Sequence, residues 1–402
     1  MEKIADRFLR YVSIDTQSKD DMPTIPSTEK QFDLAKLLYK ELCDMGIEAK
    51  TDEHGYVYGF IHNNNGKEHP VIGLIAHMDT SPDAGGKDIK VQKVKYEGGD
   101  VTLNKELGIY LSPNAFPYMN EIKGETILCT DGTTLLGADD KAGVAAIMSL
   151  AQFITENPDF KHGEIRIGFT PDEEVGNGAT LFDVKGFGAD YAYTVDGGTV
   201  GEIEYENFNA CSLRVNIKGA NIHPGSAKDV MVNAALLAME FNSLLPENQK
   251  PQYTEGYDGF FHLSDMSGSV EEAHLSYIVR DHDAEKFKKK QETAKAAADF
   301  LNKKYGDHVS IEITEQYRNM KEMVEPHMFL IENLKSAIAE AGVEPKIVAI
   351  RGGTDGARLS YMGLPCPNMG TGGQNFHGRY EFITIESMER NLEILKNLCQ
   401  KF

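Results

Sequence analysis

Residues 71–79 read Val-Ile-Gly-Leu-Ile-Ala-His-Met-Asp, an apolar run that ends in a histidine and an aspartate two positions apart. Such a run, rich in β-branched residues, favours a buried strand. Two more runs end in the same way, because EIRIGFT leads to Asp172 and YAYTV leads to Asp196. In an open α/β sheet, ligands bind at the loops that leave the carboxyl ends of the strands. The pattern therefore predicts acidic and imidazole side chains gathered at one edge of a sheet.

Helical patterns alternate with these strands through the first half of the chain. We expect strands near 55–61, 71–76, 164–169 and 191–195, and helices at 2–12, 28–45, 140–156 and 178–183. A capping box of Thr28 and Gln31 is expected to begin the second helix, and Gly46 to end it. The alternation predicts a mainly parallel sheet flanked by helices. Residues 81–126 interrupt it and are expected to form a small β-structure beside the site.

The pattern changes between about 208 and 317. Strands are expected at 209–219, 257–264, 271–280 and 308–317, with helices at 230–245 and 284–304. This order is that of a split-βαβ α+β sandwich. The alternation of helices and strands then returns, with helices at 326–341 and 384–400 on either side of a strand at 346–350. We therefore expect one catalytic domain, residues 1–207 and 319–402, interrupted by an inserted domain at 208–318.

Composition and charge exclude several classes of protein. The 402 residues include 41 basic and 62 acidic side chains, for a net charge of -21, which would repel nucleic acid and anionic lipid. No apolar segment approaches the roughly 20 residues that cross a bilayer, and the first residues look like an amphipathic helix and not a signal peptide. The five cysteines are scattered and odd in number, so buried, reduced thiols are expected. A cytoplasmic protein without nucleic-acid or membrane partners is the expectation.

Five separate clusters of potential metal ligands stand in the chain. They contain His77 and Asp79, Asp139 and Asp140, Glu173 and Glu174, Asp196, and His377. Each has a structural alternative: a core histidine, an aspartate that caps a helix, or a solvated acidic loop. Together they predict a metal centre. Imidazole and carboxylate ligands without thiolate suit zinc, cobalt or manganese.

The spacing suggests a division of roles within this centre. His77 and Asp196 would hold one metal ion and Glu174 and His377 the other, with Asp139 between them, because one carboxylate can bridge two cations. The side chains of Glu173 and Glu174 diverge, so one can ligate while the other acts as general base. Asp79 shares a strand face with His77 and could hold its second ring nitrogen.

Seven motifs resemble those of the M20 family of di-zinc exopeptidases, and more narrowly its tripeptide aminopeptidases. They are IAHMDT, LLGADDKAG, TPDEEVGNGA, VDGG, NIHPGSAKD, RGGTDGARLS and GTGGQNFHG. The match runs through nearly the whole chain, and the stretch of about 60 residues between the first two fits this branch. The resemblance implies a cis peptide after Asp139, Glu173 as the base and Asp79 as the orienting carboxylate. The implied ligands are His77, Asp139, Glu174, Asp196 and His377.

The resemblance also concerns the inserted domain. It implies a homodimer formed through this domain, with His223 reaching the partner subunit's site to stabilise an oxyanion. Arg280 and Arg351 are candidates to bind the C-terminal carboxylate of a peptide, since a guanidinium can grip a carboxylate with two hydrogen bonds. An ion pair of Arg280 with Asp281 or Asp283 is the structural alternative.

The expected activity is release of the N-terminal residue from tripeptides, through attack by a hydroxide that two zinc ions per subunit activate, with cobalt or manganese as possible substitutes. Two alternatives stay open. One is a related hydrolase of the same family, a dipeptidase or an N-acyl amino-acid deacylase. The other is a non-catalytic module that binds metal or peptide, which would require a missing base or ligand.

Overall fold

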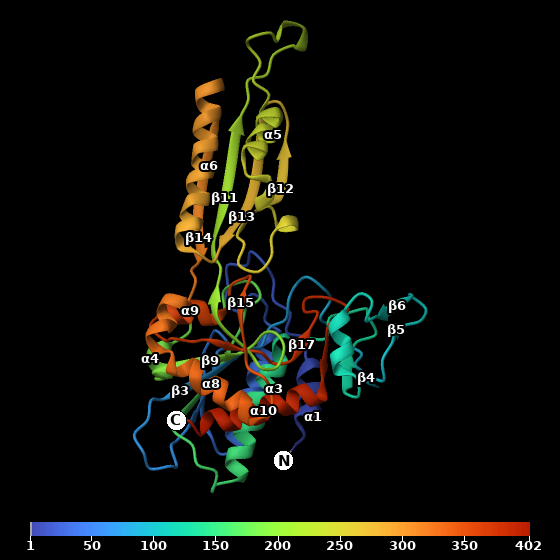
Figure 1. Cartoon of the computed structure of the whole chain (residues 1–402), viewed down its shortest axis with the longest axis vertical. Coiled ribbons are helices and arrows are strands. Elements are labelled where there is room, and N and C mark those ends of the chain that lie inside the picture. Colours follow the sequence, from blue (N-terminus) through green and yellow to red (C-terminus); the bar gives the residue numbers. More distant parts are fainter. Residues whose placement is uncertain (1) are drawn as a thin grey trace. The chain divides into compact units, whose positions relative to one another are not determined.

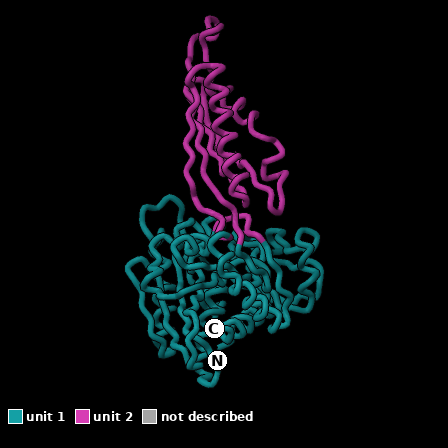
Figure 2. Tube along the Cα trace, turned by 60° about the vertical axis from the view of Figure 1, so that its left-hand side comes forward, with its two compact units in different colours: residues 1–205, 322–348, 354–402 teal, residues 206–321, 349–353 magenta. Residues whose placement is uncertain are grey.

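The computed structural model describes residues 2–402, which form two compact units (Figure 2). Unit 1 holds residues 1–205, 322–348 and 354–402, and unit 2 holds residues 206–321 and 349–353. Both ends of the chain belong to unit 1 (Figure 2). The segment 208–318, which the sequence suggested as an insertion, falls within unit 2, and residues 349–353 join it there.

Unit 1 is built on an eight-stranded sheet with the order β1-β2-β8-β3-β9-β16-β10-β15. In that order, the strands are Glu48–Thr51, Val57–Ile61, Ile165–Thr170, Ile72–His77, Tyr191–Val195, Asn368–Met369, Glu202–Asn207 and Lys346–Ile350. Parallel pairs join the four central strands, β8 to β3, β3 to β9 and β9 to β16, while the pairs β1–β2, β2–β8 and β10–β16 are antiparallel. The mainly parallel sheet is therefore confirmed. The strands expected near 55–61 and 71–76 are not neighbours, because β8 lies between them.

Helices flank this sheet (Figure 1). The α-helices of unit 1 are α1 Ile4–Val12, α2 Gln31–Asp44, α3 Ala138–Glu156, α4 Val184–Phe187, α8 Phe329–Glu340, α9 Asp355–Tyr361 and α10 Ile385–Cys399, with α7 Lys321–Val324 at the unit boundary and a 3-10 turn at Glu325–His327. Helix α3 packs on β3 and contacts α1 and α10. An apolar cluster that includes Ile75, Phe187 and Leu359 packs α4 and α9 against the sheet.

Two local predictions in this unit are wrong. Residues 178–181 form turns and not a helix, and the short helix α4 begins later, where the Asp183 side chain accepts a hydrogen bond from Gly186 N. Helix α2 begins without a side-chain cap, so Thr28 and Gln31 do not form a capping box. The Gln31 side-chain amide donates to Thr28 Oγ1 at 3.2 Å and to Asp172 Oδ1, 141 residues away, at 2.6 Å, and neither bond caps the helix. Gly46 does follow the helix with a φ of 78°, as expected.

The interruption at 81–126 forms the expected small β-structure. Strands β4 Gln92–Lys95 and β7 Thr126–Cys129 join β17 Gly373–Gln374 and β18 Phe382–Thr384 in the order β17-β18-β7-β4. A hairpin of β5 Val101–Asn104 and β6 Ile109–Leu111 and a 3-10 helix at Pro117–Ile122 complete it (Figure 1). Strands β17 and β18 flank the loop that carries His377. The inserted strands β4 and β7 therefore extend a sheet that begins at this loop.

Unit 2 is an α+β sandwich. Its sheet has the order β12-β13-β11-β14, with antiparallel pairs throughout. The elements follow one another as β11 Asn209–Lys218, α5 Ala234–Leu244, β12 Phe260–Gly268, β13 Glu272–Asp281, α6 Ala284–Tyr305 and β14 Val309–Tyr317, with 3-10 turns at Pro224–Ser226, Glu247–Gln249 and Pro251–Tyr253. Alternate residues of β11 and β13, such as Leu213 and Leu275, form a core with Phe241 and Leu301 of the helices. The split-βαβ order is confirmed.

Cysteine pairing and membrane-spanning potential can be compared with the sequence expectations. Each of the five cysteines is a free thiol, and four are buried as expected, but Cys43 is exposed near the end of α2. Within residues 2–402, none of the helices combines the length and the apolar character needed to span a bilayer.

Candidate metal centre

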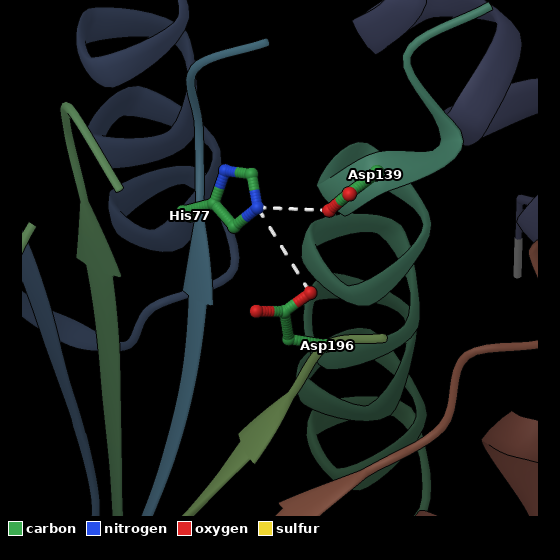
Figure 3. Close-up of side chains that lie close together, drawn as sticks. All are labelled: His77, Asp139 and Asp196. Atoms are coloured by element: carbon green, nitrogen blue, oxygen red, sulfur yellow. Dashed lines mark hydrogen bonds and ion pairs between the residues drawn. The ribbon is translucent and has the colours of Figure 1, made fainter. Parts of the chain in front are cut away.

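Three potential ligands meet at the carboxyl edge of the central sheet (Figure 3). His77 is the last residue of β3, Asp196 directly follows β9, and Asp139 stands at the beginning of α3. The His77 Nε2 atom lies 2.9 Å from Asp139 Oδ1 and 3.9 Å from Asp196 Oδ1. Because β3 and β9 are parallel neighbours, their ends place His77 and Asp196 side by side.

A second group of three shares the carboxylate of Asp139. Its other oxygen, Oδ2, lies 3.5 Å from His377 Nε2, and that nitrogen lies 2.9 Å from Glu174 Oε2. Asp139 thus presents one oxygen to each histidine. This is the arrangement expected of a carboxylate that bridges two cations.

The two neighbouring aspartates have different environments. Asp140 accepts backbone hydrogen bonds from Gly143 N at 3.1 Å and from His77 N at 3.2 Å, so its carboxylate caps the helix and supports the histidine. Asp139 instead faces the other ligands. The peptide bond between the two aspartates is cis, and both have non-helical backbone angles, so the regular part of α3 begins after them. The helix-cap alternative therefore applies to Asp140.

Asp79 is fully buried and connects the histidine to the acidic turn. Its oxygens accept the backbone N–H groups of Glu173 at 3.0 Å and Glu174 at 3.2 Å. Asp79 Oδ1 also lies 3.2 Å from His77 Nδ1, the ring nitrogen that faces away from the other ligands. One carboxylate thereby orients a ligand of the first group and the turn that carries a ligand of the second.

Burial and close charges shift the proton affinity of these groups. Burial disfavours the charged ring of His77, but hydrogen bonds with Asp139 and Asp79 raise its pKa well above the usual value. Hydrogen bonds with Asp139 and Glu174 raise the pKa of His377 to about 11. Burial and the charge of Asp139 raise the pKa of Glu174 to about 8. Burial opposes ionisation of Asp139, yet its hydrogen bonds with the two histidines hold its pKa below the usual range.

The same causes act on the remaining acids of the site. Burial and the charge of Asp139 raise the pKa of Asp196 to about 7. The pKa of Glu173 is also raised, first by burial and then by nearby carboxylates that include Asp196 and Asp355. Buried acids so close together repel one another, and a bound divalent cation removes that cost.

The residues present fit a pair of metal ions. The donor atoms are carboxylate oxygens and imidazole nitrogens, the set that suits zinc and similar divalent metals. Glu174 Oε1 is buried and has no hydrogen-bond partner among residues 2–402. Since a buried oxygen of this kind is costly to leave unpaired, it is available as a ligand atom.

Several residues outside the predicted ligand set support the ligand loops. Asp83 Oδ2 lies 3.2 Å from His377 Nδ1. Asp172 accepts Ser27 N at 2.5 Å and Gln31 Nε2 at 2.6 Å, which anchors the turn before Glu173. These partners come from segments remote in the chain, and short local motifs contain no signal for them.

The three expected substrate-binding residues belong to unit 2. His223 is exposed, and its Nδ1 accepts a hydrogen bond from Gly225 N at 3.1 Å. Arg280 Nη1 donates to the backbone oxygen of Arg351 at 3.0 Å. The alternative ion pair of Arg280 with a neighbouring aspartate is not what forms, because Asp281 pairs with Lys290 at 3.0 Å.

Comparison with known proteins assigns this centre to a class. The model of peptidase family M20/M25/M40 matches residues 135–401. The chain belongs to this family and is a peptide hydrolase.

Individual relatives are more specific. Peptidase T of Alkaliphilus oremlandii is 53% identical over the full length of both chains, and peptidase T of Clostridium perfringens is 52% identical over 100% of this chain and 99% of its own. The crystal structure of aminopeptidase PepT from Bacillus cereus superposes with a TM-score of 0.79 at 23% identity, over 99% of this chain and 98% of its own. A Staphylococcus aureus tripeptidase gives the same TM-score at 21% identity, over 99% and 97% of the two chains. The two solved structures confirm the fold.

Proposed function

We propose that this protein is a zinc-dependent tripeptide aminopeptidase that releases the N-terminal residue of its substrate. The observation that carries this proposal is the carboxylate of Asp139, which faces His77 with one oxygen and His377 with the other. The relatives named peptidase T, at 52–53% identity over the full chain, support the choice of substrate.

Five residues would hold the two metal ions. His77 and Asp196 belong to one ion, Glu174 and His377 to the other, and Asp139 to both. Two bound zinc ions would lower the pKa of a water molecule to about 7 and polarise the carbonyl of the scissile peptide bond.

Glu173 would transfer a proton from the attacking water to the leaving amine. Asp79 accepts the N–H groups of Glu173 and Glu174, which fixes the turn that carries both side chains. The charges of His77 and Asp196 act on the Glu173 carboxylate, while Glu174 would ligate. Glu173 would accept a proton from the attacking water and pass it to the leaving amine, the role of a positioned general base and acid. Burial favours the protonated carboxyl that the second step needs.

Arg280 would bind the C-terminal carboxylate of the tripeptide. Its Nε atom is buried and, among the described residues, has no hydrogen-bond partner, so the guanidinium has a donor to offer. Arg351 already donates from Nη1 to the oxygens of Gly256 at 2.5 Å and Asp258 at 3.1 Å. We therefore assign Arg351 a secondary role in binding the same C-terminal carboxylate.

The proposal includes a homodimer in the cytoplasm. In it, His223 of unit 2 would reach the partner subunit's centre and stabilise the developing oxyanion. His223 is exposed and lies on the loop before a short 3-10 turn, which leaves its ring available to a second copy.

A matched substrate panel tests the proposal. The zinc-loaded protein is offered a free tripeptide, its N-acetyl form, its C-terminal amide, and the related dipeptide and tetrapeptide. We expect cleavage of the free tripeptide with release of its first residue, and at least a tenfold lower kcat/KM for the amide. Preference for the N-acetyl or dipeptide substrate would favour the deacylase or dipeptidase alternative. No turnover with zinc bound would favour the binding module.

A further inference from the structure

Glu381 is a buried carboxylate that joins two ligand loops of the metal centre. It lies four residues after His377, directly before β18, and only 1% of its surface is exposed. Its Oε2 accepts backbone hydrogen bonds from Leu136 N at 2.7 Å and Gly137 N at 2.8 Å. Its Oε1 accepts a third from Asp139 N at 3.1 Å. Three backbone donors in the loop of the shared ligand, from residues 136, 137 and 139, therefore converge on one side chain.

These donors need a partner in this position. The N–H groups of Leu136, Gly137 and Asp139 lie before the regular part of α3, and buried backbone N–H groups require an acceptor. Gly137 has a φ of 83°, which turns the chain so that its own N–H and the two others point to the same side. A carboxylate is the acceptor best suited to several backbone donors, because its charge strengthens each hydrogen bond. Glu381 thus defines where the backbone of Asp139 lies.

The other end of this connection is the loop of His377. Glu381 N donates to Gly378 O at 3.2 Å, which closes the turn directly after the histidine. Asn375 and His377 both have left-handed backbone angles, with φ of 57° and 61°. Asn375 is held by its amide, which donates to Tyr380 O at 3.0 Å, the residue before Glu381. The loop from 375 to 381 is therefore a compact turn with Glu381 at its anchored end.

We propose that Glu381 is a positioning residue that sets the separation of Asp139 and His377, and thereby the affinity of the metal group formed by Asp139, Glu174 and His377. The inference rests on the proposed two-metal function. It is selective, because the other group, with His77 and Asp196, depends on Glu381 only through Asp139. A carboxylate that merely stabilised the fold would affect both groups alike.

The test replaces Glu381 by glutamine, which keeps the shape but sets an NH2 group against backbone donors. Stepwise zinc affinities are measured by competition with a chromophoric chelator. We expect one ion per chain to bind about 10- to 100-fold more weakly, the usual effect of losing a partner that orients a ligand, and the other to change less than threefold. His377→Ala serves as the reference variant, because it removes a ligand from the group formed by Asp139, Glu174 and His377. Glu389→Gln, an exposed acid of α10, controls for loss of charge and should leave both affinities unchanged.

Cobalt absorption spectra identify the weakened site. The bands lost at limiting cobalt in Glu381→Gln should be those lost in His377→Ala. Unchanged affinities, or equal weakening of both ions together with a lower melting temperature, would overturn the inference while leaving the two-metal function in place. A wild-type protein that binds a single ion would instead overturn the two-metal function, and the inference with it.

A measurement on the unchanged protein covers the case that the variant does not fold. Amide hydrogen exchange at Leu136 and Gly137 is followed with and without zinc. If Glu381 builds the loop before metal binds, both amides should be protected in the metal-free protein. Exchange as fast as that of exposed amides until zinc is added would contradict the inference.

Discussion

Asp79→Asn tests the claim that one buried carboxylate orients the centre. The Asp79 carboxylate accepts the N–H of Glu173 on Oδ1 and that of Glu174 on Oδ2. Oδ1 also lies 3.2 Å from His77 Nδ1, whose hydrogen bond goes to the backbone oxygen of Asp79 at 3.1 Å. Asparagine keeps one oxygen and replaces the other by NH2. With the oxygen turned to the N–H of Glu173, the NH2 group faces the N–H of Glu174, and a buried donor loses its partner.

The expected magnitude follows from these contacts. A hydrogen bond to a charged group contributes about 1.5–3 kcal/mol, and each 1.36 kcal/mol corresponds to roughly a tenfold change. We therefore expect kcat/KM for a tripeptide to fall about 10- to 150-fold. The loss should persist at saturating zinc, because the turn of the base is displaced as well as the ligand.

The assay is steady-state hydrolysis of a free tripeptide by wild type, Asp79→Asn and the control Asp299→Asn, an exposed aspartate of α6. Zinc content is measured on the same samples. Activity of Asp79→Asn within threefold of wild type, with both ions bound, would refute the reasoning.

Three further outcomes are expected. Glu173→Ala should lower kcat by about 10²- to 10⁴-fold, the share of a general base, while metal analysis still finds both ions; retained turnover would exclude it as the base. Gly143→Ala should lower the free energy of unfolding, measured by urea denaturation, by about 1–3 kcal/mol, because its Cβ would lie 1.8 Å from Val195 O; an unchanged free energy of unfolding would contradict this packing. Burial opposes ionisation of Glu164, but hydrogen bonds, first from Asn63 N, lower its pKa to about 2. The folded state therefore favours the ionised form, and the stability this adds is present above about pH 4.5 and lost as the pH falls towards 2. The difference in unfolding free energy between wild type and Glu164→Gln should narrow over that range, and a constant difference would disprove the assignment.

Local patterns predicted most of the elements, but not all. The apolar runs before His77, Asp172 and Asp196 are the strands β3, β8 and β9, because burial on both faces of a parallel sheet leaves a continuous apolar signal. The helix expected at 178–183 is wrong, since these residues form turns before Asp183 caps α4. The Thr28 and Gln31 capping box is also wrong, because no side chain caps α2 and the Gln31 amide extends to the remote Asp172 as well as to Thr28.

The sequence by itself determined the class of the centre. Histidine and carboxylates at strand ends, without thiolates nearby, already indicated zinc, cobalt or manganese and the residue types that would hold them. It also determined the split between a parallel sheet and an antiparallel sandwich, because the two have different periodicity and element order.

Only the tertiary structure decided how these residues divide the work. It separates Asp139, which faces both histidines, from Asp140, which takes backbone donors, although the two are adjacent and identical in the sequence. It also brings Glu381 to the amides of residues 136–139, more than 240 positions earlier in the chain. The physical reason is that a hydrogen bond depends on the positions of two groups in space, and partners so far apart leave no trace in a local pattern.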